Sequence, residues 1–226
     1  NSRWYTGSGI YRHVWQTVTD PLHIGHWGTF VTTADVDSAA ATVAVETRLE
    51  NTDGTARRGT LRLEVVDPEG RVVATGEAGF RLEAGGVDTT VAELRVAEPA
   101  LWDLESPSLY TLRSVVTGEG GGAVDASETK FGIRSIAYDP DLGFLLNGRQ
   151  VKHRGVNLHH GGGPVGAAVP EAVWERRFRL LKAMGVNAIR TAHNPMAPEF
   201  YDLCDRLGFL VMDEAFDEWT HGKVEY

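Results

Sequence analysis

The last third of the chain contains the pattern that most constrains its fold, because strand-like and helix-like segments alternate there. Segments that look like strands occupy Gln150–Val156, 186–190 and Phe209–Met212, and the last of these is continuously apolar. Between them, residues 170–184 and 198–207 carry apolar side chains at helical spacing. The order strand, helix, strand, helix, strand predicts the beginning of an α/β domain, because a helix is the usual crossover between parallel strands.

Both predicted helices have recognisable ends and a buried stripe. Pro170 and Pro198 fit a first helical turn, where the missing amide donor is not needed. Gly185 and Gly208 follow the last apolar residues, where a glycine commonly ends a helix. The residues expected to face inward are Val173, Trp174, Phe178, Leu181 and Met184 in the first helix, and Phe200, Leu203, Cys204 and Leu207 in the second.

The middle of the chain, residues 25–136, has a different pattern. Short runs with partial alternation, such as 61–66 and 90–96, are separated by turn residues, such as Asp-Pro-Glu-Gly at 67–70. About seven such strands without a helix-period segment predict an immunoglobulin-like β-sandwich. A small barrel is the alternative, since periodicity alone does not separate the two.

Composition excludes several classes of protein. Lys and Arg number 22 against 31 Asp and Glu, a net charge of −9, which argues against a nucleic-acid partner. No apolar run approaches the roughly 18 residues of a membrane helix. The single cysteine, Cys204, excludes an internal disulfide framework. The chain starts at Asn1 without an initiator Met or a leader, which we interpret as a processed or excised piece, either cytoplasmic or exported from a bacterium.

Two neighbouring stretches carry a family resemblance. Asn-Ala-Ile-Arg-Thr-Ala-His-Asn-Pro at 187–195, followed by residues 205–214, closely resembles a signature segment of glycoside hydrolase family 2. That family includes β-galactosidases, β-glucuronidases and β-mannosidases. Residues 2–12, 143–148 and 154–160 also look like family segments and occur in the family's order.

The resemblance implies three regions. Residues 1–24 look like the end of an N-terminal sugar-binding-type jelly roll, 25–136 like the immunoglobulin-like domain, and 137–226 like the first part of a (β/α)₈ TIM barrel. A complete barrel takes about 250 residues. The expected fold is therefore an immunoglobulin-like β-sandwich followed by the first part of a barrel.

The function implied by the resemblance is that of a retaining β-glycosidase, and we favour a β-galactosidase. Such enzymes use two carboxyl groups about 5 to 5.5 Å apart, one as acid/base and one as nucleophile. The family places both on later barrel strands, so no catalytic residue is assigned in this chain. The signature His is commonly followed by Tyr, and Asn194 stands here instead, so the substrate of Tyr-bearing members is not transferred. The alternative is a non-catalytic carbohydrate-binding or structural sandwich module.

The predicted substrate-binding residues all follow predicted barrel strands, where barrel enzymes place their sites. By resemblance, Arg190 orients the nucleophile and His193 donates to a sugar hydroxyl, although a structural ion pair and a loop histidine are the plainer interpretations. The full predicted set is Arg190, His193, Asn194, His159 and Asp213, with His160 and Glu214 given less weight.

We expect no metal or other cofactor. Glu218 and His221 resemble a magnesium-binding stretch of some family β-galactosidases, but their spacing is one residue longer, and Mg²⁺ prefers oxygen ligands. Trp219 is a candidate platform for a sugar ring or a core residue, and Cys204 is expected in the core. The expected partner is a carbohydrate substrate, with no nucleic acid or membrane, and a homo-oligomer remains open.

The three predicted parallel strands lack partners at their edges, because a barrel removes its edges only when it closes. We therefore expect Val156, Ile189 and Val211 to be exposed on the face that further strands would cover.

Overall fold

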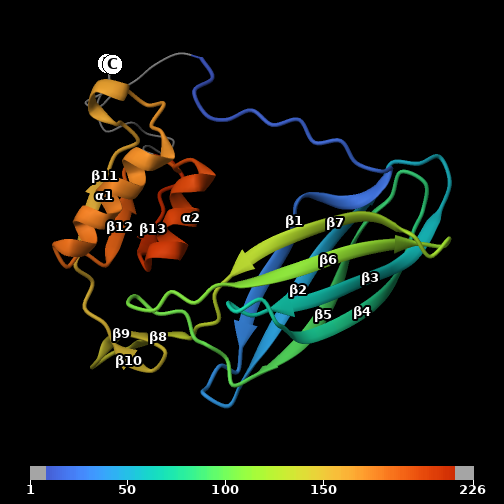
Figure 1. The fold of residues 1–226 in the computed structure, drawn as a ribbon, viewed down its shortest axis with the longest axis horizontal. Coiled ribbons are helices and arrows are strands. Elements are labelled where there is room, and N and C mark those ends of the chain that lie inside the picture. The colour runs from blue at the N-terminus through green and yellow to red at the C-terminus, as the bar shows by residue number, and fades with distance from the viewer. Residues whose placement is uncertain (1–8, 217–226) are drawn as a thin grey trace. The chain divides into compact units, whose positions relative to one another are not determined.

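A computed structural model describes residues 9–216 (Figure 1). The described chain forms two compact units, which we treat separately. One comprises Gln16–Asp103 and Ser108–Gln150, and the other the described residues among 1–15, 104–107 and 151–226.

The first unit contains the sandwich. Its long strands are β1 (Leu22–Ala34), β2 (Ala40–Asn51), β3 (Arg57–Val66), β4 (Val72–Leu82), β5 (Val87–Ala97), β6 (Tyr110–Gly118) and β7 (Ala123–Phe131). They form two antiparallel sheets, in the orders β1-β2-β5 and β4-β3-β6-β7. Two separate sheets confirm the sandwich prediction, and the small-barrel alternative is wrong. The residues packed between the sheets include Leu22, Val43, Val45, Leu49, Leu61, Leu63, Val65, Leu112 and Val116.

The first strand, β1, was not recognised as a separate strand in the sequence. Its pairing with β2 shifts between Ile24 and Thr29, so the intervening residues bulge from the ladder. Within this bulge, Trp27 has a φ of 54° and its side chain is exposed. A Cβ on Gly28 would lie 2.5 Å from the carbonyl oxygen of Gly25, so the bulge requires glycine there. The bulge interrupts the alternation by which strands are recognised.

Tyr110, at the start of β6, links two parts of the sandwich. Its ring is buried, and its hydroxyl accepts a hydrogen bond of 2.8 Å from the amide of Ala100. Burial raises the pKa of Tyr110. A tyrosine at this corner that bonds to the backbone upstream is typical of immunoglobulin-like sandwiches.

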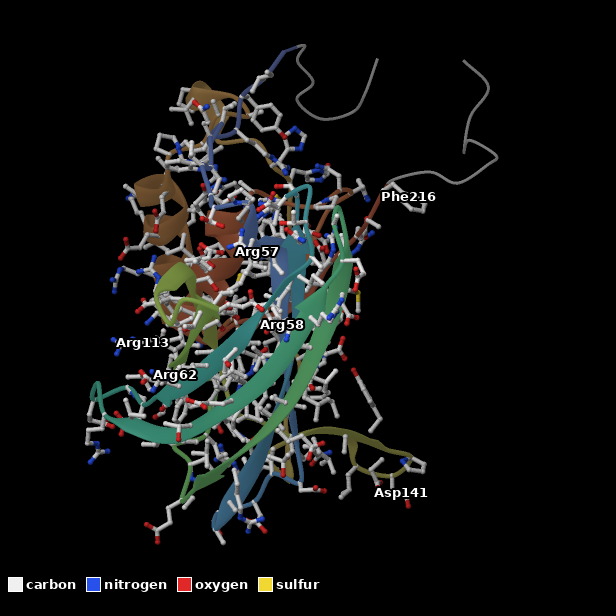
Figure 2. All side chains as sticks on the ribbon, turned by 90° about the vertical axis from the view of Figure 1, so that its right-hand side faces the viewer. Arg57, Arg58, Arg62, Arg113, Asp141 and Phe216 are labelled. Atoms are coloured by element: carbon white, nitrogen blue, oxygen red, sulfur yellow. The ribbon has the colours of Figure 1, made fainter. Side chains whose placement is uncertain are left out.

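The outer face of the larger sheet carries exposed ion pairs (Figure 2). Arg58 pairs with Glu119 at 2.7 Å, and Arg62 pairs with Glu77 at 3.0 Å. Arg113 on β6 pairs in the same way with a glutamate of β7. Exposed pairs of this kind contribute about 0 to 1 kcal/mol each. The arginines are therefore balanced by carboxylates and do not form a continuous basic surface.

Three short strands follow the sandwich: β8 (Ile136–Asp139), β9 (Gly143–Leu146) and β10 (Arg149–Gln150). They make a small antiparallel sheet in the order β10-β9-β8. Asn147 turns the chain with a φ of 51°, and its side-chain amide donates to the carbonyl of Trp102. The stretch expected at the entry to the barrel, 143–148, thus forms β9 and its turn, grouped with the sandwich unit.

The second unit contains the parallel sheet. Its elements are β11 (Gly155–Leu158), the 3₁₀ turn η1 (Gly163–Val165), α1 (Glu171–Ala183), β12 (Ala188–Thr191), α2 (Pro198–Leu207) and β13 (Leu210–Met212). The sheet order is β11-β12-β13, with both pairs parallel. The strand–helix–strand–helix–strand prediction is therefore confirmed. None of the described helices is long and apolar enough to cross a membrane.

The two helices end where the sequence predicts. Gly208 closes α2 in the left-handed conformation with φ 70°, and Gly185 follows α1 with φ 82°. The helices pack against the sheet around two aromatic rings, Phe178 and Phe200, which meet edge to face with centroids 4.9 Å apart. The prediction that Met184 faces inward is wrong. Met184 caps α1 and is 77% exposed, because the helix ends before its side chain reaches the buried stripe.

The first parallel strand starts later than predicted. The backbone from 151 to 154 has no regular structure, and β11 begins at Gly155. The side chain of Asn187 explains this difference, since it accepts from the amide of Arg154 and donates to the carbonyl of Lys152. A side chain thus takes the hydrogen bonds that a neighbouring strand would otherwise make.

The residues on the buried face of the parallel sheet differ from the prediction. Val156, Ile189 and Val211 are register partners on one face and pack on the helix side, with Ile189 only 1% exposed. The opposite face carries Arg190 and its register partner Met212, which is 67% exposed. The expected exposure of the first three residues is therefore wrong. The prediction placed the apolar residues on the wrong face, and alternation along a strand makes the two choices mutually exclusive.

Amide exchange should differ between the two units. In the isolated 226-residue chain we expect β11, β12 and β13 to exchange faster than β2, β3 and β6. Strands of three or four residues with open edges unfold locally at lower cost than long paired strands. Hydrogen exchange followed by mass spectrometry measures this. Uniformly slow exchange in a dilute monomer would show that the three-stranded unit is stable by itself.

Candidate functional site

The predicted site residues lie at one edge of the parallel sheet. His159 directly follows β11, His193 and Asn194 follow β12, and Asp213 follows β13. Since the strands are parallel, their carboxyl ends share an edge. Arg190 reaches this edge from within β12. All five predicted residues are therefore at this edge.

Glu214 connects two of the predicted residues. One carboxylate oxygen contacts the guanidinium of Arg190, and the other lies 3.0 Å from Nδ1 of His193. The three side chains are partly buried, between 20% and 37% exposed. Hydrogen bonds between charged partners are stronger than neutral ones. Glu214 therefore fixes the guanidinium of Arg190 and the imidazole of His193 relative to each other.

Glu214 was given little weight by the sequence reasoning. The reason for its role is visible only in the structure, where Arg190 pairs with Met212 across the sheet and Glu214 follows two residues later. A carboxylate just beyond a strand end, beside an arginine of the next strand, is well placed for an ion pair. The structural ion pair considered for Arg190 is thus present, and its partner is Glu214.

Asp213 belongs to a second hydrogen-bond network. Its Oδ1 accepts from Thr191 Oγ1 at 2.7 Å and from the Tyr201 hydroxyl at 2.6 Å. Thr191 Oγ1 accepts in turn from the amide of Glu214. The Tyr201 hydroxyl accepts from the amide of Met196. This network ties α2 to the ends of β12 and β13, and one oxygen of Asp213 is engaged in it.

Tyr201 and Thr191 were missed by the sequence reasoning. Burial, together with the hydrogen bond to Asp213, raises the pKa of Tyr201 to about 12. The Tyr201 hydroxyl therefore stays protonated at neutral pH and remains a donor to Asp213. Thr191 is fully buried. Neither residue stands out in the sequence. Tyr201 lies in a predicted helix and Thr191 directly after a predicted strand, and the apolar pattern of these segments gives no reason to single out either hydroxyl.

The histidines occupy different surroundings. The rings of His159 and His193 meet edge to face with centroids 5.3 Å apart. His160 instead stacks with Tyr11 at 6.3 Å, and its buried Nδ1 atom has no hydrogen-bond partner among the described residues. His159 and His193 therefore form a pair beside Arg190, and His160 lies apart from it.

The loop after β12 carries Asn194. The peptide bond between Ala192 and His193 is cis. The side-chain amide of Asn194 donates to the carbonyl of Pro195 at 3.3 Å, and the same carbonyl accepts from Arg12 at 2.6 Å. The loop is thus held by side chains rather than by a strand or a helix.

The arrangement can position a polar ligand with cationic, imidazole and amide groups. In the described residues, the two carboxylates of the site, Asp213 and Glu214, are both engaged with protein partners. No group of three or more His, Cys, Asp or Glu side chains within 9–216 could hold a metal ion. Glu218, Trp219 and His221, considered above for magnesium and for sugar stacking, lie outside the described residues.

Cys204 takes no part in the site. It is buried in the core between α2 and the sheet, and burial raises the pKa of its thiol. The core role expected for it is confirmed.

Comparisons with known proteins match nearly the whole chain. Residues 22–134 match the family model described as glycosyl hydrolases family 2, and residues 140–225 match its TIM barrel domain. A β-galactosidase of Bacteroides ovatus, BoGH2A, is 46% identical over all 226 residues, which make up 26% of that protein. A putative β-glucuronidase of Formosa agariphila is 35% identical over 224 residues, 99% of this chain and 21% of the relative.

A solved structure agrees with these matches. A glycosyl hydrolase family 2 member from Bacteroides cellulosilyticus superposes with a TM-score of 0.95 and 40% identity. The alignment covers 100% of this chain and 29% of that structure. The chain thus spans about a quarter of the length of the relatives that it matches.

Proposed function

The chain belongs to glycosyl hydrolase family 2, and from this premise we propose that it is part of a longer retaining β-glycosidase. In this proposal the described residues bind and orient the terminal sugar. The two catalytic carboxyl groups come from barrel strands outside this chain. The observation that carries the proposal is the Glu214 cluster with Arg190 and His193 at the carboxyl ends of barrel strands.

Each side chain has a proposed task. Arg190 orients the carboxylate that attacks the sugar, since a guanidinium can serve two carboxylates through its five donors. His193 and His159 bind sugar hydroxyls. Asn194 supplies an amide to the same region. Asp213 is proposed as a ligand only through the oxygen that Thr191 and Tyr201 leave available.

We propose β-galactosides as the substrates. The support is the name of the relative that is 46% identical along the whole chain, a β-galactosidase. The relative at 35% identity is named as a putative β-glucuronidase, so a glucuronide is the competing substrate. A non-catalytic sandwich module is the second candidate, favoured only by the complete sandwich in the first unit.

The test assays the full-length protein and the isolated 226-residue chain with nitrophenyl β-galactoside and nitrophenyl β-glucuronide. We expect the full-length protein to prefer the galactoside by at least about tenfold in kcat/KM, a discrimination of about 1.4 kcal/mol. We expect no turnover by the isolated chain above buffer, because double displacement needs two carboxyl groups across the scissile bond.

Each other result has a distinct meaning. Preference for the glucuronide would contradict the proposed substrate but keep the glycosidase. No turnover of any β-glycoside by the full-length protein would favour the module. Turnover by the isolated chain that persists through repurification would show that carboxyl groups within the 226 residues perform the chemistry.

A further inference from the structure

We propose that Arg12 is a positioning residue for the sugar site, acting through the loop that follows β12. The inference rests on the proposed function, since the loop carries the proposed sugar ligands His193 and Asn194. It concerns a segment that precedes the sandwich in sequence, far from the barrel signature.

Three consecutive residues contact the edge of the parallel sheet. Arg12 donates from Nη2 to the carbonyl of Pro195 at 2.6 Å, and His13 Nδ1 lies 2.6 Å from Oε1 of Glu199. Tyr11 stacks on His160. The hydrogen-bonded partners are 183 and 186 residues apart in sequence. One short segment thus touches the loop after β11, the loop after β12 and the first turn of α2.

The contact of Arg12 bears directly on the proposed ligands. Pro195 follows Asn194, and its carbonyl accepts from both Arg12 and the Asn194 amide. If the guanidinium is removed, the carbonyl loses its stronger, charge-assisted donor. The loop residues 193–195 lie between β12 and α2, so no ladder or helix hydrogen bond replaces that donor. The peptide that accepts from Asn194, two residues after His193, then becomes less constrained.

The contact of His13 reinforces the same attachment at α2. The hydrogen bond from His13 is the first cause of the lowered pKa of Glu199. Glu199 lies in the first turn of α2, where a negative charge also suits the helix dipole. Because His13 is largely exposed, at 67% of its side chain, we assign the positioning role to Arg12.

The experiment is a double-mutant cycle in the full-length protein. Arg12→Met is combined with His193→Ala, and kcat and KM for the nitrophenyl galactoside are measured for all four proteins. We expect Arg12→Met alone to lower kcat/KM about tenfold, since small displacements of positioning groups are costly. In the His193→Ala background we expect less than about a threefold further loss, because the two changes act on one unit.

Two variants serve as controls. Arg12→Lys keeps a cationic donor. On a logarithmic scale, its kcat/KM should recover at least half of the loss that Arg12→Met causes. Arg58→Met removes an exposed arginine of the sandwich that pairs with Glu119, and should leave kcat/KM unchanged. A general loss of folding would lower kcat/KM equally with and without the His193→Ala change, and Arg12→Lys would not restore it. An undiminished effect of Arg12→Met in the His193→Ala background would overturn the inference.

A second measurement does not depend on activity. Hydrogen exchange in the full-length protein should be about fivefold or more faster in Arg12→Met than in the unchanged protein for the backbone amides of residues 193–199 other than Pro195 and Pro198, with β2 and β3 unaffected. Unchanged exchange in the loop would overturn the inference even if the enzyme is active. Faster loop exchange in a protein that hydrolyses neither glycoside would support the contact and contradict the proposed function.

Discussion

Replacing Arg190 with alanine is expected to lower kcat/KM of the full-length protein by more than tenfold, about 1.4 kcal/mol or more of transition-state stabilisation. The guanidinium is the cation of the Glu214 cluster, and its loss leaves that carboxylate without its ion-pair partner. The remaining contact from His193 then has to hold Glu214 alone. Steady-state kinetics with the preferred nitrophenyl glycoside measures the loss.

Matched variants separate this effect from a general loss of structure. Arg206→Ala removes an arginine of the second unit that pairs with Glu171 on α1 at 2.7 Å, and should leave turnover nearly intact. Cys204→Ala alters the core without touching the site and should also keep turnover. Arg190→Lys should recover little, because an ammonium lacks the planar fork of donors. Unchanged kinetics in a correctly folded Arg190→Ala protein would return Arg190 to a purely structural ion pair.

The second large effect concerns the sandwich. Gly59→Ala is expected to lower the free energy of unfolding by about 3 kcal/mol, near the upper end of the usual cost of overpacking. A Cβ at this position would lie 2.0 Å from the backbone carbonyl oxygen of Thr117 on the neighbouring strand β6. Since that atom is backbone, the collision is relieved only if β3 and β6 move apart. Urea unfolding followed by far-ultraviolet circular dichroism and by tryptophan fluorescence, to which the buried Trp102 contributes, measures the change.

Gly79→Ala is the matched control in the same sheet. Gly79 lies on β4, and the nearest atom to its added Cβ is the carbonyl oxygen of Gly59 at 4.0 Å. Its expected change is within about 0.5 kcal/mol. Equal destabilisation by the two substitutions would show that loss of glycine flexibility, rather than the collision with Thr117, governs this sheet.

The kinds of elements and their order follow from local sequence signals. The turn residues Asp-Pro-Glu-Gly at 67–70 separate β3 from β4, as their composition predicts. Gly208 ends α2 because its left-handed conformation suits glycine. Such signals involve only a few consecutive residues, so they can be recognised from the sequence alone. The bulge at Trp27 interrupts the alternation of β1, and there the same reasoning loses the strand.

Which face of a short strand is buried does not follow from local sequence signals. Strands of three or four residues, such as β12 and β13, offer too few positions for alternation to identify the covered face. Packing against α1 and α2 decides that Ile189 faces the helices. Arg190, the next residue, thereby points to the opposite face and toward the proposed ligand.

The sequence by itself determined the strand and helix order of the parallel-sheet unit, the ends of its helices and the group of residues at its strand ends. Only the tertiary structure decided their partners. Whether Asp213 or Glu214 meets Arg190 depends on the register between β12 and β13, which no local pattern encodes. The contact of Arg12 with Pro195 joins residues 183 positions apart. Local signals cannot specify such contacts, because their energies arise only after the chain has folded and brought the partners together.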